Sequence, residues 1–111
     1  MNHDDQRYLT EMLDYAHRIL SLPGSSERHI FDTDITQRVT ITHWLQIIGE
    51  AARHVSDEYQ LKHTEVPWRA MTGMRNRIVH DYLGVDDEVV WETASLRIPE
   101  LIALLEKLLT R

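Results

Sequence analysis

Glycine and proline are scarce in this chain, and they fall between segments whose apolar residues repeat at helical spacing. The 111 residues include four glycines and three prolines, the two residue types that most strongly interrupt regular structure. Between them, apolar residues recur every three or four positions, which is typical of helices that bury one face against a core. The sequence therefore predicts an all-α protein built from a few long helices.

Two long helices are expected in the first half of the chain. The first begins at one of the aspartates at 4–5, whose carboxylates can cap the free N–H groups of a first turn, and it ends at the loop 21–26. The second begins at Asp32 or Asp34 and runs to about Tyr59. Both helices are long enough to form the frame of a bundle.

Two further helices are expected in the second half. Pro67 suits the first position of the third helix, since its missing N–H has no partner there in any case, and Gly84 suits a left-handed stop after Leu83. Asp86 can cap the fourth helix, which Pro99 should kink, because its ring crowds the preceding turn and it has no N–H to donate. Four long helices with short connections predict an up-and-down bundle.

The second predicted helix is apolar on more than one side. One side carries Ile35, Val39, Leu45, Ile48, Ala52 and Val55, and another carries Ile41, Trp44, Ile47 and Ala51. A helix wedged between neighbours buries several faces, and so does a helix at a subunit contact. Both arrangements fit the pattern, and oligomerisation is one of them.

The composition limits the class of protein. With 42% hydrophobic and 27% charged residues, the chain has the make-up of an ordinary globular protein, and we expect a single domain over residues 1–111. The absence of cysteine excludes disulfides, thiolate metal sites and a cysteine nucleophile. No apolar run reaches the roughly 18 residues of a membrane helix, and the N-terminus is acidic where a signal peptide would be basic. We therefore expect a cytoplasmic protein that makes no membrane contact.

Positive charge is concentrated in one segment of an acidic protein. The chain has 18 Asp and Glu against 12 Lys and Arg, a formal net charge of −6, which disfavours sequence-independent wrapping of a phosphate backbone. Residues 67–80, however, contain no acid and include Arg69, Arg75 and Arg77. Any contact with nucleic acid is therefore expected to be local, at this segment.

On a helical wheel, the third helix is polar where it should be apolar. Arg75 falls on the stripe that Met71 and Ile78 direct toward the core. Its stem can pack there while its guanidinium pairs with a carboxylate such as Glu50, or the planar fork can hold a phosphate in a cleft. A second stripe carries Arg69, Gly73, Asn76 and His80. The last two of these are four residues apart and can touch.

His80 and Tyr82 add groups suited to acid–base chemistry. A histidine near a helix end is often only a partner of the helix dipole, and a bundle tyrosine often only has a solvated hydroxyl. Together with Arg75, however, they supply an anion clamp, a group that titrates near neutral pH and a phenol. On an ideal helix Arg75 and His80 are about 140° apart. Either the helix loosens before Gly84, or the long arginine reaches round, or two copies of the motif face each other across a dimer.

The segment from Arg75 to Tyr82, which reads Arg-Asn-Arg-Ile-Val-His-Asp-Tyr, resembles the R-x4-H-x-Y signature of HEPN domains, specifically their HepT-like branch. The surrounding sequence is similar to the same branch at residues 48–52, 67–69, 73–76, 84–86, 90–92 and 98–101. The resemblance therefore covers nearly the whole chain.

This resemblance implies a homodimeric HEPN-like bundle of four to five helices that acts as the toxin of a type VII-like toxin–antitoxin pair. Such a toxin is an endoribonuclease that cleaves cellular RNA without a metal ion or another cofactor. Its partner is a cognate minimal nucleotidyltransferase antitoxin, which transfers AMP to the tyrosine of the signature, here Tyr82. The resemblance thus implies both an activity and a way of silencing it.

Cleavage of RNA without metal assigns roles to the residues of the signature. The neighbouring 2′-hydroxyl acts as the nucleophile, so the protein must supply a proton acceptor, a proton donor and positive charge at the phosphorane. We expect His80 to transfer protons, Arg75 to hold the phosphate, and Asn76 to orient either His80 or the phosphate. Arg69 and Arg77 are the expected RNA-binding residues, although Arg77 can equally be a solvated side chain.

A second hypothesis belongs to another class of protein. In it the chain is a non-catalytic module that binds the nucleotidyltransferase and uses residues 75–82 to hold a nucleotide or to serve as its substrate. Both hypotheses predict a phosphate-binding cleft, and they differ at His80, because only cleavage needs a proton shuttle.

A metal centre is not expected, since the seven histidines form no H-E-x-x-H motif and the pair of Glu50 and His54 is too small a ligand set.

Overall fold

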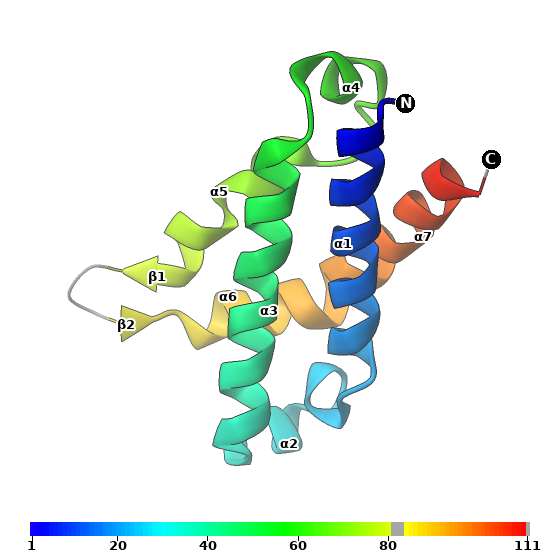
Figure 1. Cartoon of the computed structure of the whole chain (residues 1–111). Coiled ribbons are helices and arrows are strands. Elements are labelled where there is room, and N and C mark those ends of the chain that lie inside the picture. Colours follow the sequence, from blue (N-terminus) through cyan, green and yellow to red (C-terminus); the bar gives the residue numbers. More distant parts are fainter. Residues whose placement is uncertain (81–83, 111) are drawn as a thin grey trace.

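Helices account for most of the structure, a computed structural model that describes residues 1–80 and 84–110 (Figure 1). The long helices are α1 (His3–Leu20), α3 (Ile35–His54), α5 (Trp68–Ile78) and α7 (Ile98–Leu109). The shorter helical segments are η1 (Pro23–Ser25), α2 (Arg28–Thr33), α4 (Asp57–Lys62), α6 (Asp87–Glu92) and the π-helical turn η2 (Thr93–Arg97). A hairpin of β1 (Val79–His80) and β2 (Gly84–Val85) follows α5. The predicted all-α bundle is confirmed.

Helix α3 lies at the centre of the bundle, with α1 on one side and α5 on the other (Figure 1). The buried apolar residues of α3 are Ile41, Leu45, Ile48, Ala51 and Ala52. Those of α1 are Leu9, Met12, Ala16 and Ile19. Because two neighbouring helices cover α3, most of its apolar character on several sides is explained within one chain.

Two residues of α3 depart from the predicted core. Ile35 and Val39 are 63% and 59% exposed, although the apolar pattern places them on the same side as Leu45. The step from position 39 to position 45 is six residues, which is not a helical repeat and turns the chain by about 240° around the axis. The prediction was therefore wrong for the first two turns, which leave an exposed apolar strip on α3.

The start of α1 and the end of α3 both differ from expectation. Asn2, and not an aspartate at 4–5, caps α1, since its side-chain oxygen accepts the Asp5 N–H at 2.7 Å. Asp34 caps α3 as predicted. However, α3 ends at His54 and not near Tyr59, because Ser56 caps the separate helix α4. The predicted second helix is thus two helices joined by a turn.

Asp5 does not cap α1, as the sequence predicts, but makes a tertiary contact with Ser56. Its side chain is 3% exposed, and its carboxylate accepts both the backbone N–H of Ser56 at 2.8 Å and the hydroxyl of Ser56 at 2.6 Å. A buried carboxylate is tolerated when hydrogen bonds of this kind satisfy it. Asp5 therefore ties the first turn of α1 to the junction between α3 and α4.

The third predicted helix ends well before Gly84, and the fourth is interrupted just before Pro99. Helix α5 starts directly after Pro67 but ends at Ile78, five residues before the predicted end at Leu83. Asp86 caps α6 as predicted. The π-helical turn η2 precedes Pro99, at the place where a kink is expected, and α6 and α7 run in different directions (Figure 1).

No helix among the described residues is both long and apolar enough to cross a membrane.

Candidate active site on helix α5

Helix α5 carries the acid-free segment, and its inner side is packed on α3. Trp68, Met71, Met74 and Ile78 are all buried. The two helices approach closely at Gly49, where an added Cβ would lie 2.7 Å from the backbone carbonyl oxygen of Met71. A larger residue at this point would push α5 outward. Packing therefore fixes the depth at which α5 sits and the direction in which its other sides face.

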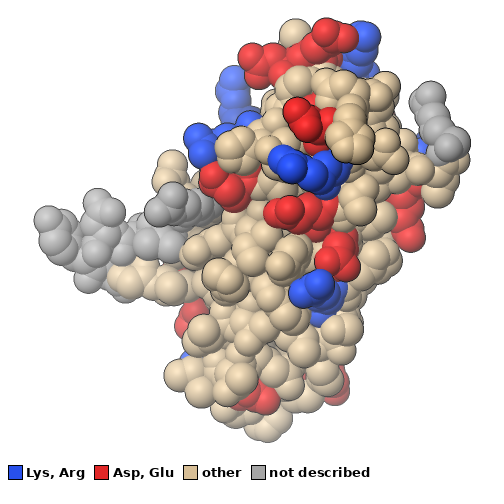
Figure 2. All heavy atoms as spheres, viewed as in Figure 1, with Lys and Arg blue, Asp and Glu red and all other residues tan. Residues whose placement is uncertain are grey.

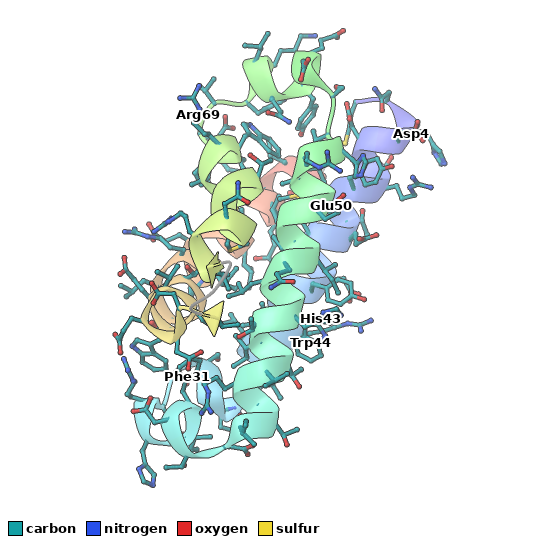
Figure 3. All side chains as sticks on the ribbon, turned by 90° about the vertical axis from the view of Figure 1, so that its left-hand side faces the viewer. Asp4, Phe31, His43, Trp44, Glu50 and Arg69 are labelled. Atoms are coloured by element: carbon teal, nitrogen blue, oxygen red, sulfur yellow. The ribbon has the colours of Figure 1, made fainter. Side chains whose placement is uncertain are left out.

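The opposite side of α5 carries Arg69, Gly73 and Asn76, as the helical wheel predicts. Arg69 and Asn76 are exposed, and no described atom lies within 4 Å of the position that a Cβ on Gly73 would occupy. Seven residues separate Arg69 from Asn76, so they share a face about 10 Å apart along the axis. Figure 3 shows Arg69 at the end of α5 that is farther from the hairpin. This face is open to a ligand.

Arg69 and Arg77 differ from most arginines of the described chain. Five arginines pair with carboxylates, namely Arg18, Arg28, Arg38, Arg53 and Arg97. Arg69 and Arg77 are exposed, and neither forms an ion pair with another described residue. Their guanidinium groups are therefore available to an anion such as phosphate.

The backbone changes from helix to strand between Arg75 and His80. Helix α5 ends at Ile78, and His80 lies in β1, where it pairs with Gly84 of the antiparallel strand β2. The Asp86 N–H closes this ladder on the Ile78 carbonyl oxygen at 2.7 Å. Gly84 has a φ of 78°, a left-handed conformation that glycine adopts without strain. The left-handed conformation of Gly84 therefore belongs to the hairpin, whereas the sequence predicts it at the end of a helix.

This change of backbone answers the geometrical difficulty of the motif. Helical spacing no longer applies to His80, so neither its 140° separation from Arg75 nor its predicted helical contact with Asn76 describes the molecule. Of Arg75 and His80 the structure describes the backbone, and their side chains lie outside the described parts. Tyr82 lies outside the described residues altogether. The structure therefore brings the backbones of Arg75, Asn76 and His80 to one end of α5.

Glu50, the carboxylate named as a partner for Arg75, has other partners. It accepts from the Arg53 guanidinium at 2.7 Å and lies 3.3 Å from His54. His54 in turn stacks on Tyr8 of α1, with ring centroids 5.3 Å apart, and Figure 3 shows Glu50 on the side of α3 turned away from α5. The Arg53 guanidinium, with a smaller effect from His54, holds the pKa of the Glu50 carboxyl below its ordinary value.

Two arginines anchor the segment that follows the hairpin. The Arg38 guanidinium donates to the Phe31 carbonyl at 2.9 Å and lies 3.5 Å from the Asp87 carboxylate at the start of α6. Arg28 pairs with Glu88 in the same turn, and this hydrogen bond holds the pKa of the Glu88 carboxyl below its ordinary value. Both contacts fix the position of α6, and with it the place where β2 leaves the bundle.

Sequence reasoning missed a cleft beside the motif, which we call the α5–α7 cleft. It has a volume of about 460 Å³ and lies between α5 and the segment formed by η2 and α7. From α5 it is lined by Ala70, Met71, Met74 and Arg77, and from the other wall mainly by Glu92, Arg97, Glu100 and Leu104. The row at positions 70, 74 and 77, spaced as one helix face, is the signal that could have revealed it. Arg77 faces this cleft.

A second, shallower hollow lies where α3 meets β2. It has a volume of about 400 Å³, and its lining includes Ile35, Val39, His43 and Val85. Val85 is 45% exposed, like the two α3 residues beside it. Figure 2 shows that the surface over the first half of α3 is almost free of charged side chains. An exposed apolar strip therefore runs up to the hairpin.

The family comparison agrees with the signature on α5. The model of the family described as "Ribonuclease HepT-like" matches residues 12–108, a range that includes the second half of α1, all of α3 and α5, both strands, and all but the last residue of α7. The chain belongs to the HepT-like ribonuclease family. The HepT-like resemblance of the sequence is thereby confirmed, and the segment from Arg69 to Tyr82 lies inside the matched region.

Two relatives with ribonuclease names are similar to this chain over more than half of its length. A protein of Methanocaldococcus jannaschii, provisionally named an RNase, is 30% identical over 106 residues, which cover 96% of this chain and 88% of the relative. A "Probable ribonuclease HepT" of Thermococcus cleftensis is 44% identical over 64 residues, or 58% of each chain. No solved structure gives a significant match. The names of these relatives agree with a ribonuclease-type function.

Proposed function

We propose that this HepT-like protein is the toxin of a HEPN/minimal nucleotidyltransferase pair and a metal-independent endoribonuclease that acts on cellular RNA. The observation that carries the proposal is the end of α5 at Ile78, after which β1 holds His80 close in the chain to Arg75 and Asn76 but outside helical spacing. A proton-transfer residue and a phosphate-binding residue need such freedom to converge on one phosphate. Membership of the HepT-like ribonuclease family supports the ribonuclease part of this proposal.

In the proposed reaction, the ribose 2′-oxygen attacks phosphorus and the 5′-oxygen leaves. The products are a 2′,3′-cyclic phosphate and a 5′-hydroxyl. The 2′-hydroxyl proton must be accepted and the leaving 5′-oxygen must receive one, and His80 performs these transfers. The Arg75 guanidinium stabilises the negative charge that develops on the phosphorane. Asn76, exposed on the last turns of α5, orients the phosphate or His80 through its amide.

Arg69 and Arg77 bind the RNA on either side of this centre. Both are exposed and lack a carboxylate partner among the described residues, and Arg69 lies about two helical turns from Asn76. That distance suits contact with phosphates beyond the one that is cleaved. The net charge of −6 confines RNA binding to this face, because the rest of the surface repels a polyanion.

The active form is proposed to be a homodimer. The apolar strip of Ile35, Val39 and Val85 is exposed in the single chain, runs up to the hairpin, and has the character of a surface that a second copy covers. Two copies would bring two His80 side chains to one centre, so that a neutral one accepts a proton while a protonated one donates. Light scattering at micromolar concentration should give twice the chain mass, and a mass near 13.1 kDa would refute the dimer.

Tyr82 is the proposed modification site. Transfer of AMP from a cognate nucleotidyltransferase would place a phosphate and a nucleoside beside Arg75 and Arg77, where they occupy the guanidinium groups that RNA needs. Intact-mass spectrometry after incubation with the partner, ATP and Mg²⁺ should show adenylyl addition to the wild type. Tyr82→Phe should remain folded and keep its mass. An unchanged wild-type mass, or equal addition to Tyr82→Phe, would show that Tyr82 lacks this role.

The proposed reaction is tested through its products and its metal requirement. RNA incubated with the protein in EDTA should be cut into fragments that carry 2′,3′-cyclic phosphate ends, because the 2′-hydroxyl is the nucleophile and the protein supplies the charge. Mass spectrometry of the fragments identifies the ends. Activity that disappears in EDTA and returns with Mg²⁺, or fragments with 5′-phosphate ends, would refute the mechanism.

A further inference from the structure

The α5–α7 cleft has the size and the floor of a ligand site. Its volume of about 460 Å³ falls within the roughly 300–1,000 Å³ of small-molecule sites. The floor is apolar and comes from Ala70, Met71 and Met74 on one side and from Leu101 and Leu104 on the other. Methionine side chains adapt their shape to a neighbouring group and make favourable contacts with aromatic rings. The floor therefore suits a planar ligand.

The wall formed by η2 and its neighbours carries alternating acceptors and donors. The Arg97 guanidinium lies 3.8 Å from the Glu92 carboxylate and 3.3 Å from the Glu100 carboxylate. All three side chains are more than half exposed, so a ligand in the cleft can share their hydrogen bonds. The π-helical turn, a local geometry often found at functional sites, contributes Arg97 to this wall.

The charges on the two walls of the cleft favour different parts of a nucleotide. Glu92 and Glu100 on the far wall, together with Glu65 just before α5, make these parts of the cleft unfavourable for phosphate, and a neutral base is free of that repulsion. Arg77, on the α5 wall, has no carboxylate partner among the described residues and is adjacent in sequence to Asn76. A phosphate held near Arg77 and Asn76 would leave its base free to turn into the cleft. Bases of single-stranded RNA are commonly recognised in this way.

The acceptor and donor groups of the far wall distinguish among the bases. Guanine offers two neighbouring donors, N1–H and N2–H, to a carboxylate, and its O6 accepts from a guanidinium. Uracil offers a single N–H between two carbonyl oxygens and has no exocyclic amino group. Guanine can therefore donate two parallel hydrogen bonds to one carboxylate while its O6 accepts from Arg97, whereas uracil can donate only one hydrogen bond to Glu92 or Glu100.

We propose that the α5–α7 cleft is a base-binding site that accepts an unpaired guanine of the RNA next to the cleaved phosphate. The proposal rests on the proposed ribonuclease function and adds a sequence preference to it. The apolar floor receives the face of the base, the wall of Glu92, Arg97 and Glu100 reads its edge, and Arg77 holds the adjoining phosphate. The protein then prefers RNA in which a guanosine lies unpaired beside the cleavage point.

Binding of uncleavable RNA measures this preference without reference to activity. The probes are fluorescent 2′-O-methyl hexauridine and the same oligonucleotide with one central guanosine, because 2′-O-methyl groups block the nucleophile. By fluorescence anisotropy, the protein should bind the guanosine probe roughly tenfold more tightly than the uridine probe, as expected for discrimination by one bidentate contact. The uridine probe reports binding through phosphates alone.

Two variants test whether the cleft carries the preference. Glu92→Gln/Glu100→Gln keeps the size of both side chains and removes their charge, and Ala70→Leu fills the floor from an exposed helix position that tolerates leucine. Each should abolish most of the guanosine preference and leave affinity for hexauridine unchanged or, for the double variant, slightly raised. Glu106→Gln, on α7 outside the cleft, is the matched control and should keep the full preference.

The outcomes separate this proposal from the one on which it rests. Equal wild-type affinity for both probes, or a guanosine preference that survives in both cleft variants, overturns the base site whether or not the protein cleaves RNA. A wild type that prefers the guanosine probe and loses the preference in the variants, but cuts no RNA, supports the base site and contradicts the proposed ribonuclease function. Wild-type protein that binds neither probe overturns both.

Discussion

The two sides of α5 differ in how far packing explains the residues found there. On the inner side, Met71 and Met74 are buried, and Gly49 of α3 permits a backbone contact that no larger residue would allow. On the outer side, Asn76 is exposed, and a Cβ on Gly73 would meet no described atom within 4 Å outside its own stretch of helix. The same helix thus carries one side whose residues the fold requires and another whose residues it does not.

This difference indicates what the outer side is for. Glycine in the middle of a helix costs about 1 kcal/mol relative to alanine, and at Gly73 no described neighbour accounts for that cost. Arg69 likewise has no partner in the described chain that would account for its charge. Features that are neutral or unfavourable for the fold are expected where a ligand must approach. Substitutions on the two sides should therefore separate stability from activity.

The largest expected loss of stability comes from the inner side. Met74→Ala removes a side chain that is 2% exposed, and deletions of this kind cost about 2–5 kcal/mol of unfolding free energy. Asn76→Ala, on the outer side of the same helix, should change it by no more than about 0.5 kcal/mol. Urea denaturation of both variants checks the contrast, and equal losses would show that the two sides do not differ as described.

A somewhat smaller loss is expected at the contact between α3 and α5. Gly49→Ala adds a Cβ whose position lies 2.7 Å from the Met71 carbonyl oxygen, and overpacking of this kind costs about 1–3 kcal/mol. The gain of about 1 kcal/mol from alanine's helix propensity offsets part of this. Urea denaturation should show a net loss, and a variant more stable than the wild type would contradict the close approach of the helices.

The opposite sign is expected at Gly73. Gly73→Ala meets no described atom within 4 Å, so the helix propensity of alanine should raise the unfolding free energy by up to about 1 kcal/mol. RNA cleavage should nevertheless fall, because the added methyl group stands between Arg69 and Asn76 on the face proposed to bind RNA. Thermal unfolding and a cleavage assay on one preparation measure both effects. A more stable variant that cleaves RNA at the wild-type rate would show that Gly73 is not part of the RNA-binding face.

The smallest effect concerns pH, at a surface pair remote from the proposed chemistry. Arg28 holds the pKa of Glu88 below its ordinary value of 4.5, so the pair stabilises the fold above pH 4.5, and this contribution is lost as the pH falls through the lowered pKa. Arg28→Gln should return the Glu88 pKa toward its ordinary value, as NMR titration of the carboxyl would show. Both groups are exposed, so stability at neutral pH should change only slightly.

How much the sequence predicts depends on whether the signal is local. The cap at Asp86 was predicted correctly, Asp34 was one of the two predicted caps, and the left-handed conformation of Gly84 was predicted although its place at a helix end was not, because each conformation depends on a few adjacent residues. The end of α3 was not predicted, because Asp5 of α1 holds the Ser56 that starts α4. The exposure of Ile35 was not predicted, because the apolar residues before position 40 were assigned to the same side as Leu45. Tertiary packing decides such cases.

The candidate site also has features that local sequence predicts and features that depend on tertiary packing. The concentration of positive charge around Arg75 and the open face of Arg69 and Asn76 follow from the sequence and from helical geometry. The hairpin that takes His80 out of the helix does not, because Val79 and His80 continue the apolar and polar pattern of α5 and only pairing with β2 makes them a strand. The α5–α7 cleft also requires two segments that meet only in the folded chain.

The proposed ribonuclease activity is best tested by the rate at which His80→Ala cleaves RNA in EDTA, compared with the rate of the wild type. We expect a loss on the order of 10²-fold or more, the usual contribution of one general acid–base group, with an unchanged thermal unfolding midpoint that shows an intact fold. Cleavage of RNA by His80→Ala at the wild-type rate would contradict the proposed role of His80 and the ribonuclease mechanism that depends on it. The chain would then be a binding module for its partner, without the proton shuttle that cleavage requires.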